Sequence, residues 1–195
     1  YLVSSGKAAL TVILKALAVV SHRRRVIIPA YTCFSVPSAI VKAGLEVVLC
    51  DVDPNTLDFK FAELEGLLNE HVLCVVSTHL FGRPADIGRV KQLCERKGIL
   101  VVEDAAQAMG GQSGDRLLGT IGDVGFYSLG RGKNITCGSG GIILASSAPI
   151  AETIELRGLP EHPHLDGRVQ LLQDLPRLIR QAELLVGGEV PALVA

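Results

Sequence analysis

The chain has 195 residues, of which 48% are hydrophobic, and this length can bury the core of one large domain. Its 19 Lys and Arg residues nearly balance its 20 Asp and Glu residues, so the formal net charge is −1. Such a balance offers no broad electrostatic attraction to nucleic acid or to an anionic membrane, and neither is expected as a partner.

Helical and strand patterns alternate along the first half of the chain. Helices are expected at residues 6–18, 36–43, 60–68 and 86–97, the last running from an acidic cap to a stop at Gly98. Apolar runs rich in β-branched residues predict buried strands at residues 26–28, 47–49, 73–76 and 99–102. Because each crossover must return over the sheet, the pattern predicts an α/β fold with a mostly parallel sheet and helices on both faces.

Glycine-rich connections replace this alternation after Gln107. Two further strands are expected at residues 125–128 and 142–144, joined by a loop that runs to Gly141. A helix or two is expected after them. The segment from Leu156 onward, which contains several prolines, is typical of a linker that leads to a helix.

The cysteines and the apolar segments bear on the compartment. The five cysteines are an odd number and contain no C-x-x-C pair, so reduced thiols in a cytoplasmic protein are expected, and no metal site. The most apolar segment, residues 8–20, is short and is interrupted by Lys15. Neither a signal peptide nor a membrane span is therefore expected.

Polar residues gather where a ligand site is expected. Ligands of mostly parallel sheets bind beyond the carboxyl ends of the strands. In this chain those ends are followed by Pro29-Ala30-Tyr31-Thr32, Asp51-Val52-Asp53, Ser77-Thr78-His79 and Glu103-Asp104-Ala105-Ala106-Gln107.

Three polar features each have an ordinary interpretation when taken alone. Asp104 follows a predicted strand and could cap the next turn through backbone N–H groups. Lys133 lies in a glycine-rich loop, where most lysines are merely solvated. The serines and Gly6 that open the first helix could form a plain N-cap, although a helix start also suits a phosphate.

Together the three features match the needs of pyridoxal 5′-phosphate (PLP). A helix start can hold the phosphate, a carboxylate can keep the pyridine nitrogen protonated, and a lysine can bind the aldehyde as a Schiff base. Desolvation or a cationic neighbour such as Arg131 would favour the neutral amine that this lysine needs. The sequence therefore predicts Lys133 and Asp104 as the catalytic residues of a PLP site.

Several segments resemble the DegT/DnrJ/EryC1/StrS aminotransferases, PLP enzymes of fold type I that mostly aminate keto-sugars attached to nucleotides. The resemblance spans about residues 3–146. The matching segments, in the family's order, are Ser5-Gly6-Lys7-Ala8-Ala9-Leu10, Pro29-Ala30-Tyr31-Thr32, His79-Leu80-Phe81-Gly82 with Pro84-Ala85-Asp86, Glu103-Asp104-Ala105-Ala106-Gln107-Ala108, and Gly122-Asp123-Val124-Gly125-Phe126-Tyr127-Ser128 running to Lys133-Asn134.

The resemblance implies a role for each segment. Lys133 would form the Schiff base and move a proton between substrate and cofactor, and its presence favours amino transfer because related dehydratases have histidine there. Asp104 would pair with the pyridinium, and Gln107 would lie by the phenolic oxygen. The other implied contacts are phosphate binding by Ser128 and the backbone of Gly6, Lys7 and Ala8, and positions near the ring for His79 and Tyr31.

The chain departs from the family pattern in three respects. Cys33 occupies the position of the aromatic residue that usually stacks on the ring, with Tyr31 or Phe34 as substitutes. The Gly-x-Asn-x-Arg segment, which contacts the phosphate across a homodimer interface, has no evident counterpart in residues 156–181. The chain also covers roughly half of a full member. Residues 1–155 would form a truncated PLP-binding large domain that lacks its N-terminal part, and residues 156–195 a linker and the start of the C-terminal region, without the small domain.

The resemblance implies a cytoplasmic homodimer that transfers an amino group from an amino acid, with glutamate as the expected donor, to a nucleotide-linked keto-sugar for polysaccharide or cell-surface sugar synthesis. Two alternatives stay open. The truncated chain could be a non-catalytic PLP-binding or interaction module, which the substitution at Cys33 favours. It could also be another fold type I PLP enzyme acting on amino acids, such as a desulfurase with Cys33 or Cys137 as sulfur acceptor.

Overall fold

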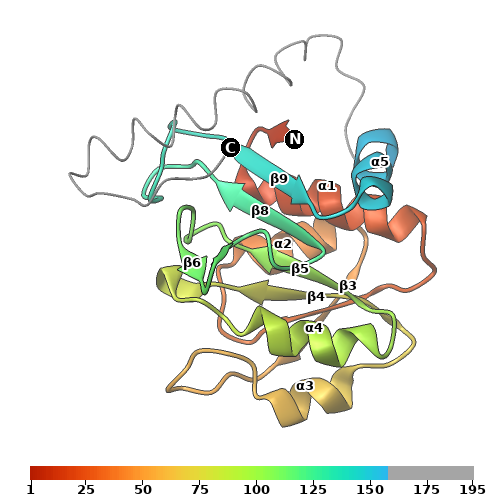
Figure 1. The fold of residues 1–195 in the computed structure, drawn as a ribbon. Helices are drawn as coiled ribbons and strands as arrows, with labels where there is room; N and C mark the ends of the chain where they lie inside the picture. Colours follow the sequence, from red (N-terminus) through yellow and green to blue (C-terminus); the bar gives the residue numbers. More distant parts are fainter. Residues whose placement is uncertain (158–195) are drawn as a thin grey trace. The chain divides into compact units, whose positions relative to one another are not determined.

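A computed structural model of the chain describes residues 1–157, which are coloured along the sequence in Figure 1. The helices are α1 (Gly6–Val19), α2 (Ser35–Lys42), α3 (Phe61–Leu67), α4 (Ile87–Glu95) and α5 (Ala148–Arg157), with a 3₁₀ helix η1 at Leu80–Gly82. The strands are β1 (Leu2–Val3), β2 (Arg25–Pro29), β3 (Glu46–Cys50), β4 (Val72–Thr78), β5 (Leu100–Asp104), β6 (Gln112–Ser113), β7 (Arg116–Leu117), β8 (Val124–Ser128) and β9 (Gly141–Ala145).

One sheet organises the fold. Its seven strands follow the order β1-β9-β8-β5-β4-β2-β3. Five of them, β2, β3, β4, β5 and β8, run parallel, whereas β9 is antiparallel to both β8 and β1. The prediction of a mostly parallel sheet is therefore confirmed, and the carboxyl ends of the five parallel strands share one edge.

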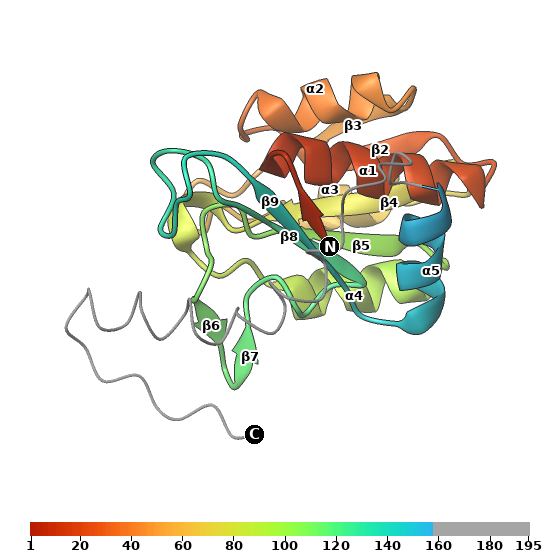
Figure 2. The same cartoon turned by 90° about the horizontal axis from the view of Figure 1, so that it is seen from above.

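Helices cover both faces of this sheet, as predicted. Figure 2 shows α1 and α2 on one face and α4 on the other. On the α1 face, alternate strand residues such as Ile28, Val76 and Val102 pack with Leu14 of α1 and Ile40 of α2 in one buried cluster. Each fully buried aliphatic side chain of this kind contributes about 1.5–3 kcal/mol, so the cluster holds α1 firmly against the sheet.

Local signals set the helix starts. The Ser5 hydroxyl accepts a hydrogen bond from the Ala8 N–H (3.1 Å) at the start of α1, and the Asp86 carboxylate does the same for the Arg89 N–H (3.0 Å) at the start of α4. Both caps satisfy N–H groups that a helix start leaves without intrahelical partners. The predicted acidic cap of α4 is thus confirmed, and the helix ends just before Gly98, which has a φ of 59°.

The sequence analysis did not predict three of the strands, and it predicted a fourth that is two residues too short at its carboxyl end. Strands β1, β6 and β7 have two residues each, too few to show an alternating pattern. The predicted strand at 99–102 continues to Asp104, because Glu103 and Asp104 pair with β4 on one side and with β8 on the other. Asp104 is therefore the last residue of a central strand and does not follow it.

The described part of the chain bears on two further expectations. Within residues 1–157 no helix is long and apolar enough to cross a membrane, and no group of three or more His, Cys, Asp or Glu residues could hold a metal ion. The linker expected from residue 156 lies outside the described residues, except for the last two residues of α5. The proposed domain boundary therefore stays a prediction.

Candidate active site

The predicted site residues lie on segments that meet at the carboxyl edge of the parallel strands. Asp104 and Ser128 are the last residues of the neighbouring strands β5 and β8. The residues that follow β2, β4 and β5 include Tyr31, Cys33, His79 and Gln107, while Gly6, Lys7 and Ala8 form the first turn of α1, and Lys133 lies in the loop between β8 and β9.

The charge of Lys133 acts on the buried carboxyl group of Asp104. Asp104 is 5% exposed, and burial raises the pKa of its carboxyl group to about 6. A hydrogen bond from the Ala106 N–H (3.0 Å) and the positive charge of Lys133 pull that pKa in the opposite direction. The structure therefore brings the carboxylate and the amine of the predicted pair within electrostatic reach, although they are 29 positions apart in the sequence.

Cys33 belongs to the same group of charges. Its thiol is exposed, and hydrogen bonds from the hydroxyl (3.1 Å) and the backbone of Ser35 lower its pKa. Burial and the charge of Asp104 raise that pKa, whereas the charge of Lys133 lowers it. Cys33 therefore lies within electrostatic reach of both Lys133 and Asp104, and it contributes a thiol with a lowered pKa at the position where the sequence resemblance led us to expect an aromatic ring.

Gly6 and Ser128 form a tight contact between α1 and β8. A Cβ atom at Gly6 would lie 2.8 Å from the Ser128 Cβ and 3.1 Å from its Oγ, so only glycine fits without movement. The absent side chain lets the first turn of α1 approach the Ser128 hydroxyl. The helix dipole, the turn's N–H groups and a hydroxyl donor thus converge, which is the donor set that a phosphate needs.

The N-cap of α1 uses one of the three backbone N–H groups that were predicted to bind a phosphate. The Ala8 N–H already donates to the Ser5 hydroxyl, which leaves the N–H groups of Gly6 and Lys7 as the donors that the cap does not use. The Lys7 side chain is exposed. The Ala8 N–H is therefore committed to the helix cap, and the phosphate contacts expected of Gly6, Lys7 and Ser128 stay predictions.

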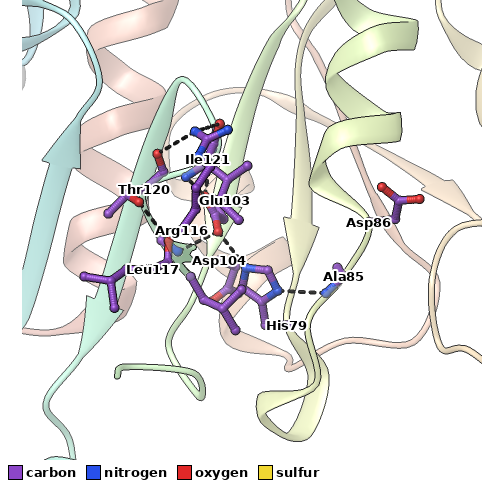
Figure 3. A network of polar contacts seen from close by, with 12 residues as sticks. His79, Ala85, Asp86, Glu103, Asp104, Arg116, Leu117, Thr120 and Ile121 are labelled. Atoms are coloured by element: carbon purple, nitrogen blue, oxygen red, sulfur yellow. Dashed lines mark hydrogen bonds and ion pairs between the residues drawn. The ribbon is translucent and has the colours of Figure 1, made fainter. Parts of the chain in front are cut away.

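His79 is fully buried, and both of its ring nitrogens have protein partners. Nε2 lies 2.7 Å from Glu103 Oε1, and Nδ1 accepts a hydrogen bond from the Ala85 N–H (2.9 Å), as Figure 3 shows. Because Nδ1 accepts, the proton of a neutral ring is on Nε2 and points to Glu103. The ring is therefore a structural link, held beside Asp104 by the hydrogen bond from the His79 N–H to the Asp104 carbonyl.

Glu103 is the residue of this region whose role the sequence did not reveal. Its buried carboxylate accepts hydrogen bonds of 2.5–2.7 Å from the N–H groups of Gly119, Ile121 and Gly122 in addition to His79. Burial opposes its ionisation, but the hydrogen bond from His79 and those from the backbone lower its pKa. The sequence shows that Glu103 precedes Asp104 and therefore points to the opposite face of the strand. It does not show which groups bind the Glu103 carboxylate there.

Gln107 contacts the segment that carries the exposed aromatic residue Phe81, which in turn lies near the exposed Tyr31. Gln107 Oε1 accepts a hydrogen bond from the Phe81 N–H (3.2 Å). The ring of Phe81 lies 6.4 Å from the ring of Tyr31 between centroids, and both side chains are more than half exposed. Tyr31 is thus placed beside Phe81, which was not among the predicted site residues.

The residues present fit PLP. The α1 turn with Ser128 suits a phosphate, buried Asp104 suits a pyridinium, and Lys133 supplies the amine within electrostatic reach of Asp104. Thr78, which pairs in register with Asp104, has a buried hydroxyl without a hydrogen-bond partner among the described residues. That unsatisfied group also points to a site built for a polar ligand.

Known proteins of one family are similar to this chain over most of its length. The model of the DegT/DnrJ/EryC1/StrS aminotransferase family matches residues 2–163. The chain is 32% identical over 160 residues to a UDP-N-acetyl-3-dehydro-alpha-D-glucosamine 3-aminotransferase of Acidithiobacillus ferrooxidans, covering 82% of this chain and 42% of that protein. It is also 32% identical over 175 residues to an L-glutamine:2-deoxy-scyllo-inosose aminotransferase of Streptoalloteichus tenebrarius, covering 87% of this chain and 41% of that protein.

A solved structure shares the fold. The PLP form of a sugar aminotransferase of Streptococcus pneumoniae superimposes with a TM-score of 0.74 at 25% identity, covering 80% of this chain and 45% of the other. The chain thus spans about two fifths of the length of the curated relatives that it matches.

Proposed function

This chain belongs to the DegT/DnrJ/EryC1/StrS aminotransferase family, and we propose that it forms the cofactor-binding part of a PLP-dependent enzyme that transfers an amino group from an amino acid to a keto-sugar. The observation that supports the proposal is that Asp104 ends β5 at the carboxyl edge of the parallel strands and that the charge of Lys133, in the loop after β8, acts on its carboxyl group. The contact of Gly6 with Ser128 adds a phosphate site to the same edge.

Each proposed residue has a chemical task. When bound, PLP supplies an electron sink that lets the α-hydrogen of an amino acid leave as a proton. Lys133 would hold the aldehyde carbon through its side-chain nitrogen, and once released would accept that proton and return it. Asp104 would keep the ring nitrogen protonated, since a carboxylate buried in this way is stabilised by a cationic partner. Ser128 and the first turn of α1 would orient the group through its phosphate.

The substrates are proposed at a finer level. The name of the Streptoalloteichus relative gives L-glutamine as its donor, so L-glutamine joins L-glutamate as a candidate donor for this chain. The name of the Acidithiobacillus relative gives a UDP-linked sugar, which supports a nucleotide-linked keto-sugar as the acceptor. A homodimer in the cytoplasm also stays part of the proposal.

A spectral titration tests the assignment of Lys133. Mixing the chain with PLP should produce the absorption band of the lysine-bound cofactor near the visible edge, and Lys133→Ala should abolish this band. Lys15→Ala, which changes an exposed lysine on α1, serves as the matched control and should leave the band intact. A band that persists in Lys133→Ala would show that another amine holds the cofactor.

A non-catalytic PLP-binding module is the second candidate, and the exposed thiol of Cys33 at the usual stacking position favours it. Adding L-glutamate or L-glutamine to the PLP-loaded chain decides between the two. Conversion of the band to that of the amine form of the cofactor supports amino transfer. An unchanged band with both donors supports the module.

A further inference from the structure

Phe81 has a backbone conformation that its side chain does not explain. Its φ and ψ are 56° and 22°, and it is one of two non-glycine residues with positive φ among residues 1–157. A bulky residue in this left-handed region is strained by an energy of the order of 1–3 kcal/mol. The ring is 66% exposed, so burial of the side chain does not offset this strain.

Contacts with Asp104, the last residue of β5, and with Gln107 hold the strained turn in place. The Phe81 N–H donates to Gln107 Oε1 (3.2 Å). The next residue, Gly82, also has positive φ, and a Cβ atom there would lie 3.0 Å from the Gln107 carbonyl oxygen. Just before the turn, the His79 N–H donates to the Asp104 carbonyl (3.0 Å). The strained turn is therefore pressed against the segment that carries Asp104 and Gln107.

The bond to Phe81 decides what the Gln107 side chain can offer to a ligand. A glutamine amide has one oxygen that accepts and one NH₂ group that donates. Since the oxygen is bound to the turn, the NH₂ group is the part of the amide that is left for a ligand. Asp104, three residues earlier, offers a carboxylate that accepts. Residues 104–107 thus offer a ligand one hydrogen-bond acceptor, the Asp104 carboxylate, and one donor, the Gln107 NH₂ group.

We propose that the left-handed turn at Phe81 is a positioning element, which orients the Gln107 amide as a hydrogen-bond donor toward an acidic oxygen of the ligand. The inference rests on the proposed function, in which that oxygen is the phenolic oxygen of PLP. The Phe81 backbone acts through Gln107, and its ring is not required. The strain is retained because relaxing the turn would free the amide.

Two substitutions at Phe81 distinguish the effect of its backbone conformation from the effect of its ring. Phe81→Gly removes the ring and adopts positive φ without strain, whereas Phe81→Val removes the ring and disfavours positive φ because it is β-branched. We expect Phe81→Gly to bind PLP like the wild type and Phe81→Val to bind at least about tenfold more weakly, with a shifted absorption maximum, as for the loss of a hydrogen bond to a charged group. Equal behaviour of the two variants would overturn the proposal.

Two substitutions at Gln107 test the orientation of the amide. Gln107→Glu keeps an acceptor for the Phe81 N–H but loses the donors, whereas Gln107→Leu loses both. In the absence of cofactor, hydrogen exchange of the Phe81 N–H should stay slow in Gln107→Glu and become fast in Gln107→Leu. With PLP, both variants should show the shifted absorption maximum.

The exchange measurement does not depend on the cofactor, so it separates the two proposals. If the wild type forms no lysine-bound PLP band, the proposed function fails. If the Phe81 N–H exchanges equally fast in the wild type and in Gln107→Leu, the positioning role fails whether or not PLP binds.

Discussion

Asp104 destabilises the folded chain by itself. Its carboxyl group is buried, and its pKa rises from 3.8 to about 6 because burial disfavours the charged form more than Lys133 and the Ala106 N–H favour it. A residue that costs stability in this way suits a cationic ligand, because the ligand's charge removes the cost. The raised pKa of Asp104 therefore agrees with the proposal that its carboxylate binds a cationic ligand.

Replacing Asp104 by Asn should therefore stabilise the protein without cofactor. Asn keeps an oxygen for the Ala106 N–H and removes the charge, so we expect a gain of up to about 3 kcal/mol at about pH 7.5. Because the folded-state pKa is raised, the wild type loses stability as the pH rises from about 4 to about 6. The gain should therefore vanish below about pH 4, as urea unfolding at a series of pH values would show.

The control for this change is Asp115→Asn, which removes an exposed carboxylate in the turn between β6 and β7. It should alter the free energy of unfolding by less than about 0.5 kcal/mol. A variant Asp104→Asn that is less stable than the wild type at neutral pH would contradict the assignment of Asp104 as a destabilising buried charge.

At the scale of elements, the junction of α1 with β8 determines whether a phosphate site can exist. The helix start supplies the N–H groups and the strand supplies the Ser128 hydroxyl, and the two meet because residue 6 has no side chain. The Ser5 cap and the buried face of α1 hold the helix in this position. The contact of α1 with β8 and the proposed phosphate site are therefore the same feature.

Gly6→Ala and Gly66→Ala form a matched pair that tests this junction. A Cβ atom at residue 6 must push Ser128 away, which we expect to cost about 1–3 kcal/mol of stability and most of the affinity for PLP. Gly66 lies in α3 with no atom within 4 Å of an added Cβ, so alanine there should stabilise the protein by up to about 1 kcal/mol. Thermal unfolding and PLP titration of both variants provide the measurement. An unchanged PLP affinity of Gly6→Ala would contradict the proposal that the phosphate binds at this junction.

At the scale of the whole molecule, the candidate site joins residues from position 6 to position 133. Its parts come from α1, from two neighbouring strand ends and from the loop between β8 and β9, and they meet only when the sheet is complete. A ligand that binds all of them must stabilise the folded state, because the unfolded chain does not hold them together.

We therefore expect PLP to raise the melting temperature, by about 5–10 °C at about 100 times its dissociation constant. Pyridoxal, which has the aldehyde and lacks the phosphate, should give a clearly smaller shift at the same concentration, because it cannot use Gly6 and Ser128. Differential scanning fluorimetry with both compounds measures the difference. Equal shifts would mean that the phosphate donors at α1 do not take part.

Much of the architecture follows from short-range patterns. Apolar runs and caps predicted the helices and the long strands, because burial on one or both faces leaves a period in the sequence. Motif residues also identified Asp104, Gln107, Ser128 and Lys133, although their roles as PLP ligands stay predictions. The shortest strands escaped detection because two residues carry no period.

The sequence by itself thus determined the α/β class, the mostly parallel sheet and the family, since these depend on side-chain types at local spacing. Only the tertiary structure decided that Glu103 binds the 119–122 segment and His79, that Phe81 engages Gln107, and that Ser128 abuts Gly6. These contacts depend on distances between residues 16 to 122 positions apart or on the strained backbone of one turn, and a one-dimensional pattern encodes neither.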